Sequence, residues 1–116
     1  MTSTSSTRVF TSEDTHAYAA ATGDWNPIHL DDAAARQAGL EGAVVHGMLP
    51  VALAIELLRR GQRRSVDLIG VRFRRPVPVG AEILVELDVS DAGATFTVSC
   101  EGEVVTDGQL LLRDGC

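Results

Sequence analysis

The sequence lacks lysine and has few aromatic residues and only two cysteines, and these shortages exclude several classes of protein. Its 116 residues include one tryptophan, one tyrosine and three phenylalanines, too few to form a stacking surface for single-stranded nucleic acid. The cysteines, Cys100 and Cys116, are not spaced as metal ligands, so neither a disulfide framework nor a zinc site is predicted. We interpret Cys100 as a packing residue of a strand.

Long apolar runs are also missing. No run approaches the ~18 residues that a membrane-spanning helix needs, and the opening MTSTSST lacks the apolar stretch of a signal peptide. We therefore expect a soluble, cytoplasmic protein whose residues 1–7 are frayed. A hydrophobic fraction of 45% predicts a single folded domain over residues 1–116, small enough for oligomerisation to help its stability.

Charged residues are unevenly distributed along the chain. The formal net charge is −6, yet seven of the ten arginines lie between Arg59 and Arg75, where only Asp67 opposes them. That segment carries +6, which leaves −12 for the remainder. One basic strip in an acidic protein suits a local anion better than general DNA binding, and arginine binds phosphate through its bidentate fork. The alternative is a solvent-exposed helix end followed by an edge strand.

Periodicity divides the chain into a helical first half and a β-rich second half. Residues 48–60 are apolar nearly all round, which predicts a buried helix. Residues 82–89 nearly alternate between apolar and acidic, as in a strand with one wet face. Short connections between the later strands favour an antiparallel meander, curled around the helix so as to bury it on all sides. The other expected elements are a short strand over 8–11, helices over 13–22 and 31–38, and strands over 66–77, 81–90, 94–102 and 103–114.

The segment GDWNPIHL, residues 23–30, gathers polar side chains around a proline. Asp24 and His29 are five residues apart and so share no helical face, and Pro27 disfavours a helix. We predict an ordered loop that folds back and brings these two side chains together, with Trp25 packing the loop down. The alternative is a polar turn in which Asp24 caps a backbone N–H and His29 is an ordinary surface histidine.

A second candidate feature, VVHGM, stands at the start of the buried helix. His46 and Gly47 lie where the first backbone N–H groups of that helix have no partner, a position suited to an anion or a developing oxyanion. His46 either faces a ligand or is hydrogen-bonded to the loop, and we favour the second. A carboxylate and an imidazole that share one water, beside such N–H groups, meet the requirements for adding water to a double bond conjugated to a thioester.

The stretch YAAATGDWNPIHLDDAAARQAGLEGAVVHGML resembles the hydratase signature of the MaoC-like family, which includes (R)-specific enoyl-CoA hydratases and related dehydratases. VRFRRPVPVGAEILV is similar to a later strand pair of the family, and the resemblance runs from about Val9 to the last strand. It implies an α+β hot-dog fold, in which an antiparallel sheet wraps a long central helix. It also implies a homodimer with an acyl tunnel at the interface, and no cofactor or metal apart from the coenzyme A or phosphopantetheine that carries the substrate.

The resemblance assigns roles by position. Asp24 and His29 match the catalytic pair that binds the water, and Asn26 orders the loop. Gly47 matches the glycine whose N–H faces the thioester carbonyl. The residues on either side of Gly47 complete the candidate oxyanion and substrate-binding set, namely His46 and Met48.

The arginine strip and two departures from the family pattern concern the substrate. Arg72, Arg74 and Arg75 are candidates for contacting the phosphates of coenzyme A, or the phosphopantetheine and acidic surface of an acyl carrier protein. The connection GQRRSVD, residues 61–67, is shorter than is typical of the hydratases, and Ala35 replaces a bulky aromatic. Both departures leave the identity of the acyl group open.

The predicted function is that of a hydro-lyase, which hydrates a 2-enoyl thioester or dehydrates an (R)-3-hydroxyacyl thioester. Alternatives are a hot-dog thioesterase, an intramolecular oxa-Michael cyclase acting on a polyketide-type substrate, and a non-catalytic acyl-binding subunit. The whole Asp-x-Asn-Pro-x-His signature favours a hydro-lyase over a thioesterase, and the presence of both Asp24 and His29 disfavours a non-catalytic subunit. The cyclase is a variant of the same addition, in which a substrate hydroxyl replaces water. No partnership with nucleic acid or membrane is expected.

Overall fold

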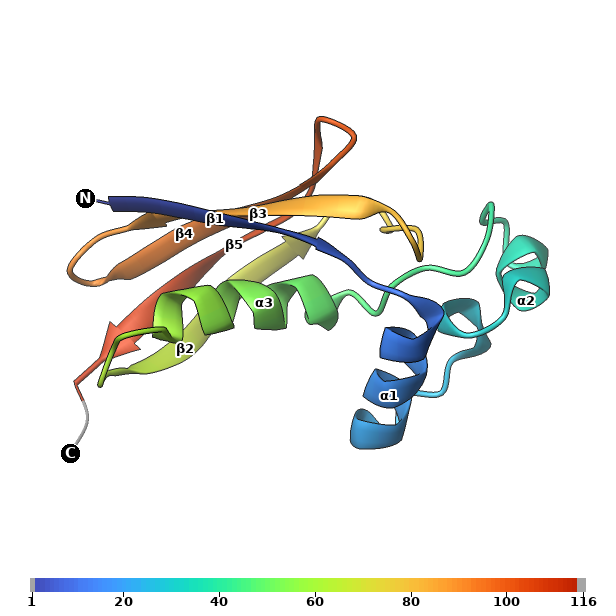
Figure 1. The fold of residues 1–116 in the computed structure, drawn as a ribbon, viewed down its shortest axis with the longest axis horizontal. Helices are drawn as coiled ribbons and strands as arrows, with labels where there is room; N and C mark the ends of the chain where they lie inside the picture. Colours follow the sequence, from blue (N-terminus) through green and yellow to red (C-terminus); the bar gives the residue numbers. More distant parts are fainter. Residues whose placement is uncertain (1, 115–116) are drawn as a thin grey trace.

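A helix packed against one face of an antiparallel sheet dominates the computed structural model, which describes residues 2–114 (Figure 1). Two shorter helices lie beyond one end of the sheet. No helix among these residues is both long and apolar enough to span a bilayer. The elements in chain order are β1 (Thr2–Val9), α1 (Ser12–Thr22), the 3₁₀ turn η1 (Pro27–His29), α2 (Asp32–Gln37), α3 (Met48–Arg59), β2 (Ser65–Phe73), β3 (Glu82–Val89), β4 (Gly93–Cys100) and β5 (Glu103–Arg113).

The strands form one sheet in the order β1-β3-β4-β5-β2. The meander prediction holds for β3, β4 and β5 but is wrong for β2, which pairs with β5 and not with β3. The segment 74–81 that follows β2 contains Pro76 and Pro78 and cannot form a tight hairpin ladder. It crosses the end of the sheet instead, where Val79 N–H donates to the Ala43 carbonyl. This crossover brings the segment alongside the residues that precede α3.

The expectation that residues 1–7 are frayed is wrong for residues 2–7. These residues belong to β1, which pairs with β3 from Thr2 opposite Val89 to Val9 opposite Glu82. Almost every side chain of β1 is exposed, so apolar burial gives no sign of this strand in the sequence. Backbone pairing with a buried neighbour holds the strand in place, and its threonines are favourable strand residues.

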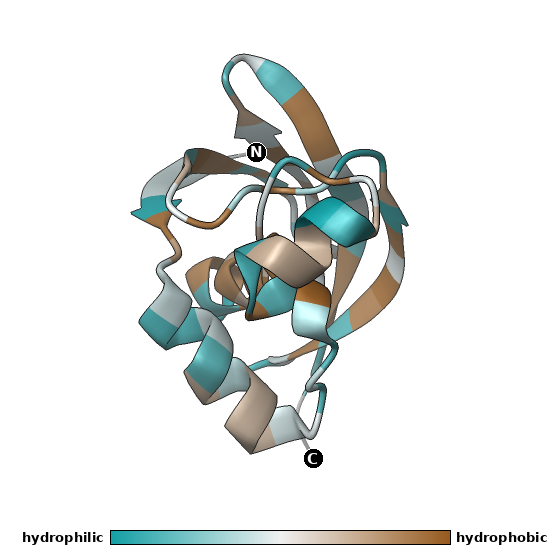
Figure 2. Cartoon of the chain, turned by 90° about the vertical axis from the view of Figure 1, so that its right-hand side faces the viewer, coloured by the Kyte–Doolittle hydropathy of each residue, from teal (hydrophilic) through white to brown (hydrophobic). Residues whose placement is uncertain are grey.

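Local signals place the helices close to the predicted bounds. Thr11 and Asp14 form a reciprocal capping box at the start of α1. Helix α3 begins after Gly47, with Pro50 in its first turn. Figure 2 shows that α1 and α2, which lie at the near end in that view, carry mainly hydrophilic and weakly apolar residues.

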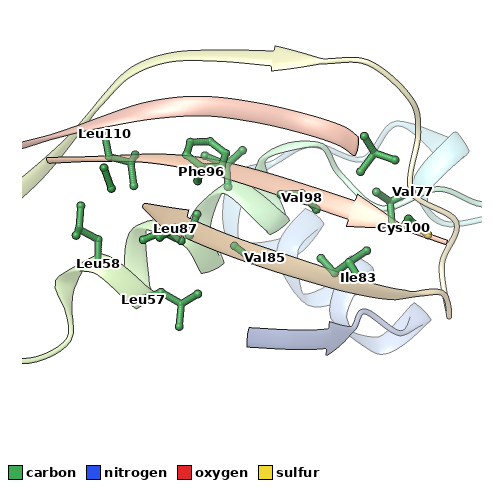
Figure 3. Close-up of a cluster of buried hydrophobic side chains, with 14 of the residues drawn as sticks. Leu57, Leu58, Val77, Ile83, Val85, Leu87, Phe96, Val98, Cys100 and Leu110 are labelled. Atoms are coloured by element: carbon green, nitrogen blue, oxygen red, sulfur yellow. The ribbon is translucent and has the colours of Figure 1, made fainter. Parts of the chain in front are cut away.

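One side of α3 and the inner face of the sheet make the core (Figure 3). Ala52 and Glu56 of α3 are exposed, so the expectation that the sheet buries this helix on all sides is wrong. The arrangement is nevertheless the α+β hot-dog fold that the resemblance implied. Each fully buried Leu, Val or Phe stabilises it by about 1.5–3 kcal/mol. Buried members include Val51, Ala54, Leu57 and Leu58 of α3, Ile83, Val85 and Leu87 of β3, and Phe96 and Val98 of β4.

Cys100 lies at the end of β4 and is 8% exposed, as expected for a packing residue. Burial raises the pKa of its thiol, which keeps it in the protonated, apolar form. Cys116 lies outside the described residues.

Candidate active site

The loop between α1 and α2 is ordered by its own short-range hydrogen bonds. Gly23 ends α1 in the left-handed conformation, with φ 79°, which a glycine adopts without steric cost. The Asn26 side chain then accepts the N–H of Ile28 over 3.3 Å and caps the turn η1. The prediction of an ordered, folded-back loop is confirmed, with one refinement: Pro27 begins a single turn of 3₁₀ helix, where its missing N–H has no cost.

The segment immediately before α3 holds this loop in place from the other side. Val44 N–H donates to the Ile28 carbonyl over 3.0 Å. His29 Nδ1 bonds to the Val44 carbonyl over 2.8 Å, and His46 Nε2 bonds to the Asp24 carbonyl over 3.0 Å. Because these contacts span 15 and 22 residues of sequence, the position of the loop depends on the tertiary fold.

The Val44 contact fixes the form of the His29 side chain. A carbonyl oxygen only accepts, so Nδ1 of His29 carries the proton and donates it. In the neutral ring this leaves Nε2 with a free lone pair, which is able to accept a proton. His29 is half-buried and is therefore both anchored and accessible.

Asp24, His29 and His46 meet at one place. One side-chain oxygen or nitrogen of each lies within 4.8 Å of the others. Asp24 is exposed and His46 is buried, with His29 between these extremes. The predicted convergence of Asp24 and His29 is confirmed. One part of the alternative is also observed, because the Asp24 side chain accepts the N–H of Asn26 over 3.3 Å. The other part is wrong, because His29 is anchored to the segment before α3 and is not an ordinary surface histidine.

These three side chains are the kind that ligate metals, but two of them are stacked. The rings of His29 and His46 lie with centroids 4.0 Å apart and planes inclined by 26°. A histidine binds a metal along a lone pair in its ring plane, and two nearly parallel rings do not direct their lone pairs at one point. The geometry is therefore poor for a shared cation, and the absence of a metal requirement stays a prediction.

A cavity of about 310 Å³ opens beside His29 and the start of α3. Gly47 lines it at the point where the helix begins, followed by Pro50 of the first turn. The first helical amide with a backbone acceptor in this turn is Leu49, which donates to the His46 carbonyl over 3.0 Å. The amide of Gly47 precedes it, in the position of unpaired N–H groups at a helix start.

The other predicted binding residues are placed differently. His46 is 2% exposed, and its bond to Asp24 is the loop contact that we favoured over ligand binding. Met48 is 38% exposed and is not part of the cavity lining. Asn26 is exposed and caps the turn, in keeping with the loop-ordering role that the resemblance implied.

The three arginine candidates, Arg72, Arg74 and Arg75, do not all lie at the same cavity. Arg74 and Arg75 line the cavity beside His29, whereas Arg72 lines a separate hollow on the sheet. Acidic residues of β5 also neutralise part of the strip, because Arg74 bonds to Asp107 over 2.6 Å and Arg75 lies 3.0 Å from Glu103. The strip is less basic in the fold than it is in the sequence.

Sequence reasoning missed several residues of the site. Phe73 lines the cavity opposite Gly47, and its only signal was its place in the stretch VRFRRPV. Val44 acts through its backbone carbonyl, which no residue type reveals. Tyr18 lies beside His46 with ring centroids 4.7 Å apart. The expectation that Trp25 packs the loop down is wrong, since 55% of its surface is exposed.

A sequence model of the family described as MaoC like domain matches residues 2–109. The chain belongs to the MaoC-like family. Its fold superposes on the (R)-hydratase from A. caviae involved in PHA biosynthesis with a TM-score of 0.81, covering 98% of this MaoC-like chain and 95% of the other at 28% identity. An R-hydratase from Pseudomonas aeruginosa gives a TM-score of 0.75 at 25% identity, over 98% and 81% of the two chains.

Curated relatives of this MaoC-like domain carry related names. A mitochondrial 3-hydroxyacyl-[acyl-carrier-protein] dehydratase of Arabidopsis thaliana is 44% identical over 67% of this chain and 48% of its own length. The (R)-specific enoyl-CoA hydratase of Aeromonas caviae is 37% identical over 70% of this chain and 63% of its own. The chain thus spans about half to under two thirds of the length of these relatives.

Proposed function

We propose that this protein is a hydro-lyase that reversibly adds water to a 2-enoyl thioester, the reverse reaction being dehydration of the (R)-3-hydroxyacyl thioester. The single observation that carries the proposal is the pairing of the Asp24 carboxylate with a His29 ring whose Nε2 is left free by the Nδ1 bond to Val44. Family membership and the named hydratase and dehydratase relatives support it.

The pair provides proton transfer. A water held between the Asp24 carboxylate and His29 Nε2 loses one proton to the pair as its oxygen bonds to the β-carbon. The electron pair of the double bond moves toward the thioester carbonyl, and the α-carbon then takes a proton from the same pair. Each such proton-transfer role is worth ~10²–10⁴-fold in rate. Dehydration uses the same groups in reverse order.

The start of α3 provides charge stabilisation. The thioester oxygen becomes an enolate in the intermediate, and the Gly47 amide lines the cavity beside His29. An N–H at a helix start stabilises such an oxyanion, with the helix dipole in the same direction. Gly47 has no side chain, which lets the Phe73 ring pack against its backbone at the cavity wall.

The cavity offers a place for the phosphopantetheine arm of coenzyme A or of an acyl carrier protein. Its wall near the helix is apolar, from Pro50, Phe73 and Val77, and Arg74 and Arg75 stand on the same lining. We place the thioester beside Gly47 and the phosphate end of coenzyme A or phosphopantetheine toward the arginines. Arg72, which lines a separate hollow, is assigned no contact with the arm.

The active unit proposed here is a homodimer. Within the described residues the sheet ends in β1 on one side and β2 on the other, and edge strands favour association with a further strand. Ile69 on β2 is 56% exposed. Light scattering after gel filtration should give twice the chain mass, and a single-chain mass at micromolar concentration would refute the dimer.

The test of function measures two changes at once, consumption of the double bond and release of thiol. The protein is incubated with crotonyl-CoA and with a longer 2-enoyl-CoA, and loss of the conjugated absorbance is measured alongside free thiol. A hydro-lyase removes the absorbance without releasing thiol, whereas a thioesterase releases thiol. The same acyl groups are also tested as thioesters of an acyl carrier protein, the second possible carrier. Asp24→Asn is the matched inactive control, and absence of absorbance loss on both carriers would refute the proposal.

A further inference from the structure

His46 is the most buried polar side chain of the site, and the mechanism above does not use it. It is 2% exposed, which leaves it no surface for a substrate. Yet it contacts both members of the proposed catalytic pair, through its hydrogen bond to the Asp24 carbonyl and its stack on the His29 ring. A residue so placed can affect the reaction without touching the reacting atoms.

The tautomer of His46 follows from the same contact. Its Nε2 lies 3.0 Å from the Asp24 carbonyl oxygen, so Nε2 carries the proton and donates it. Its Nδ1 is buried and has no hydrogen-bond partner among the residues that the structure describes. Leaving a buried polar atom unpaired is destabilising, so an ordinary packing residue would be a more stable choice at this position.

The two histidines are bonded in opposite senses. His29 donates from Nδ1 to the segment before α3, and His46, which belongs to that segment, donates from Nε2 back to the loop. Both bonds join the same two segments, and the two rings are stacked with centroids 4.0 Å apart. Rotation of either ring breaks its own bond and disturbs the stack.

We propose that His46 is a positioning residue for the catalytic pair: it holds the Asp24 backbone by its Nε2–H and the plane of the His29 ring by stacking. The inference deepens the proposed function and rests on it for its catalytic consequence. It assigns His46 no contact with the thioester, in contrast to the substrate-binding role among the sequence-based candidates. The hydrogen bond is the main contribution, because it ties Asp24 to the segment before α3. The other hydrogen bonds of Asp24, from its N–H to Thr22 Oγ1 and from the Asn26 N–H to its carboxylate, are local to the loop.

Three variants separate the two contacts of His46. His46→Gln keeps an N–H donor for the Asp24 carbonyl but removes the ring. His46→Phe keeps a ring for the stack but removes the donor, and His46→Ala removes both. His16→Ala is the matched control, since His16 is an exposed histidine of α1 whose ring bonds only within its own helix turn.

Hydration kinetics give the first readout. His46→Ala and His46→Phe should lower kcat about 10- to 100-fold with KM changed by less than about threefold, because small misplacement of a catalytic group has such effects. His46→Gln should keep about a third of kcat or more, and His16→Ala should match the wild type. If His46→Ala keeps kcat within about twofold, or raises KM alone, the proposal is wrong.

The second readout does not depend on activity. Proton–nitrogen correlation spectra of the imidazoles, assigned with single-histidine variants, should show His29 protonated at Nδ1 in the wild type and in His46→Phe, which keeps a ring for the stack. In His46→Ala the His29 signals should move toward the tautomer mixture of a free ring. An unchanged His29 spectrum overturns the positioning role. If the wild type is inactive but the His29 spectrum still changes in His46→Ala, the proposed function is refuted and the positioning role is not.

Discussion

Gly47 packs closely against one edge of the Phe73 ring. A Cβ placed on Gly47 would come within 2.9 Å of Cε1 and 3.2 Å of Cδ1 of that ring. Gly47 has helical backbone angles, φ −55° and ψ −34°, so alanine fits its conformation without strain. The requirement for glycine is therefore steric, and it concerns the cavity that both residues line.

Gly47→Ala should lower kcat/KM by about 10-fold or more, because the displaced Phe73 ring narrows the cavity beside His29. The melting temperature should change little, since Phe73 is 52% exposed and its ring is free to move. Phe73→Leu in the same chain should restore part of the activity by giving the new methyl group space. Full activity of Gly47→Ala would show that the position of the Phe73 ring against Gly47 does not matter for the substrate.

His29→Asn and Asp24→Asn should each lower kcat by at least ~10²-fold. Asparagine at position 29 can still donate to the Val44 carbonyl, from an amide placed near Nδ1, but it has no equivalent of Nε2. The loss then reports on Nε2 and not on the anchor. Thermal unfolding should stay close to that of the wild type in both variants. Asp24→Asn with wild-type kcat would exclude that carboxylate from the reaction.

The capping box of α1 predicts a pH-dependent contribution to stability. The backbone N–H of Thr11 donates to Asp14 over 2.8 Å and, with Arg8 nearby, holds the pKa of that carboxyl below its usual range. A depressed pKa in the folded state stabilises the fold above the unfolded value of ~3.9, and this contribution disappears as the pH falls through the folded value.

Asp14→Asn should accordingly lower the free energy of unfolding at pH 7 by about 0.5–1 kcal/mol. The difference from the wild type should shrink below about pH 4, as measured by urea unfolding across the pH range. Glu13→Gln, in the same helix turn, is the matched control for loss of a negative charge near the helix start. A difference that persists unchanged at pH 3 would contradict the assignment.

Deletion of residues 1–7 tests the contribution of β1, most of which was not predicted from the sequence. Because β1 pairs with β3 along the whole register from Thr2 to Val9, its loss should expose the edge of β3. We expect the free energy of unfolding to fall by more than about 1 kcal/mol, since several net-stabilising backbone hydrogen bonds are removed. Thr4→Ala in the full chain serves as the side-chain control. An unchanged melting temperature on deletion would mean that this segment adds nothing to stability.

The predictions that succeeded depended on local chemistry. The start of α3 follows from a proline that is tolerated only in a first turn, and the end of α1 follows from Gly23. The convergence of Asp24 and His29 also follows from nearby residues, since Pro27 and Asn26 together set the turn between them. Such signals operate within a few residues and can be read without knowing the rest of the fold.

The predictions that failed depended on partners far away in the chain. β2 pairs with β5 because the two prolines of the crossover prevent a hairpin with β3, and β1 is a strand because β3 offers it a free edge. The basic strip is partly neutralised because β5 places Asp107 and Glu103 beside Arg74 and Arg75. Local sequence can exclude a partner, as the prolines do for β2, but it does not name the partner that is used.

The sequence by itself determined the family, the proposed catalytic pair and the glycine at the helix start, since each depends on residue types at short, fixed spacing. Only the tertiary structure decided which nitrogen of His29 is free, because the acceptor that fixes its tautomer is the carbonyl of Val44, 15 residues further along the chain. It also decided the place of His46 between loop and helix. Residue identity does not reveal which backbone carbonyl will accept a hydrogen bond, because that depends on how distant segments pack together.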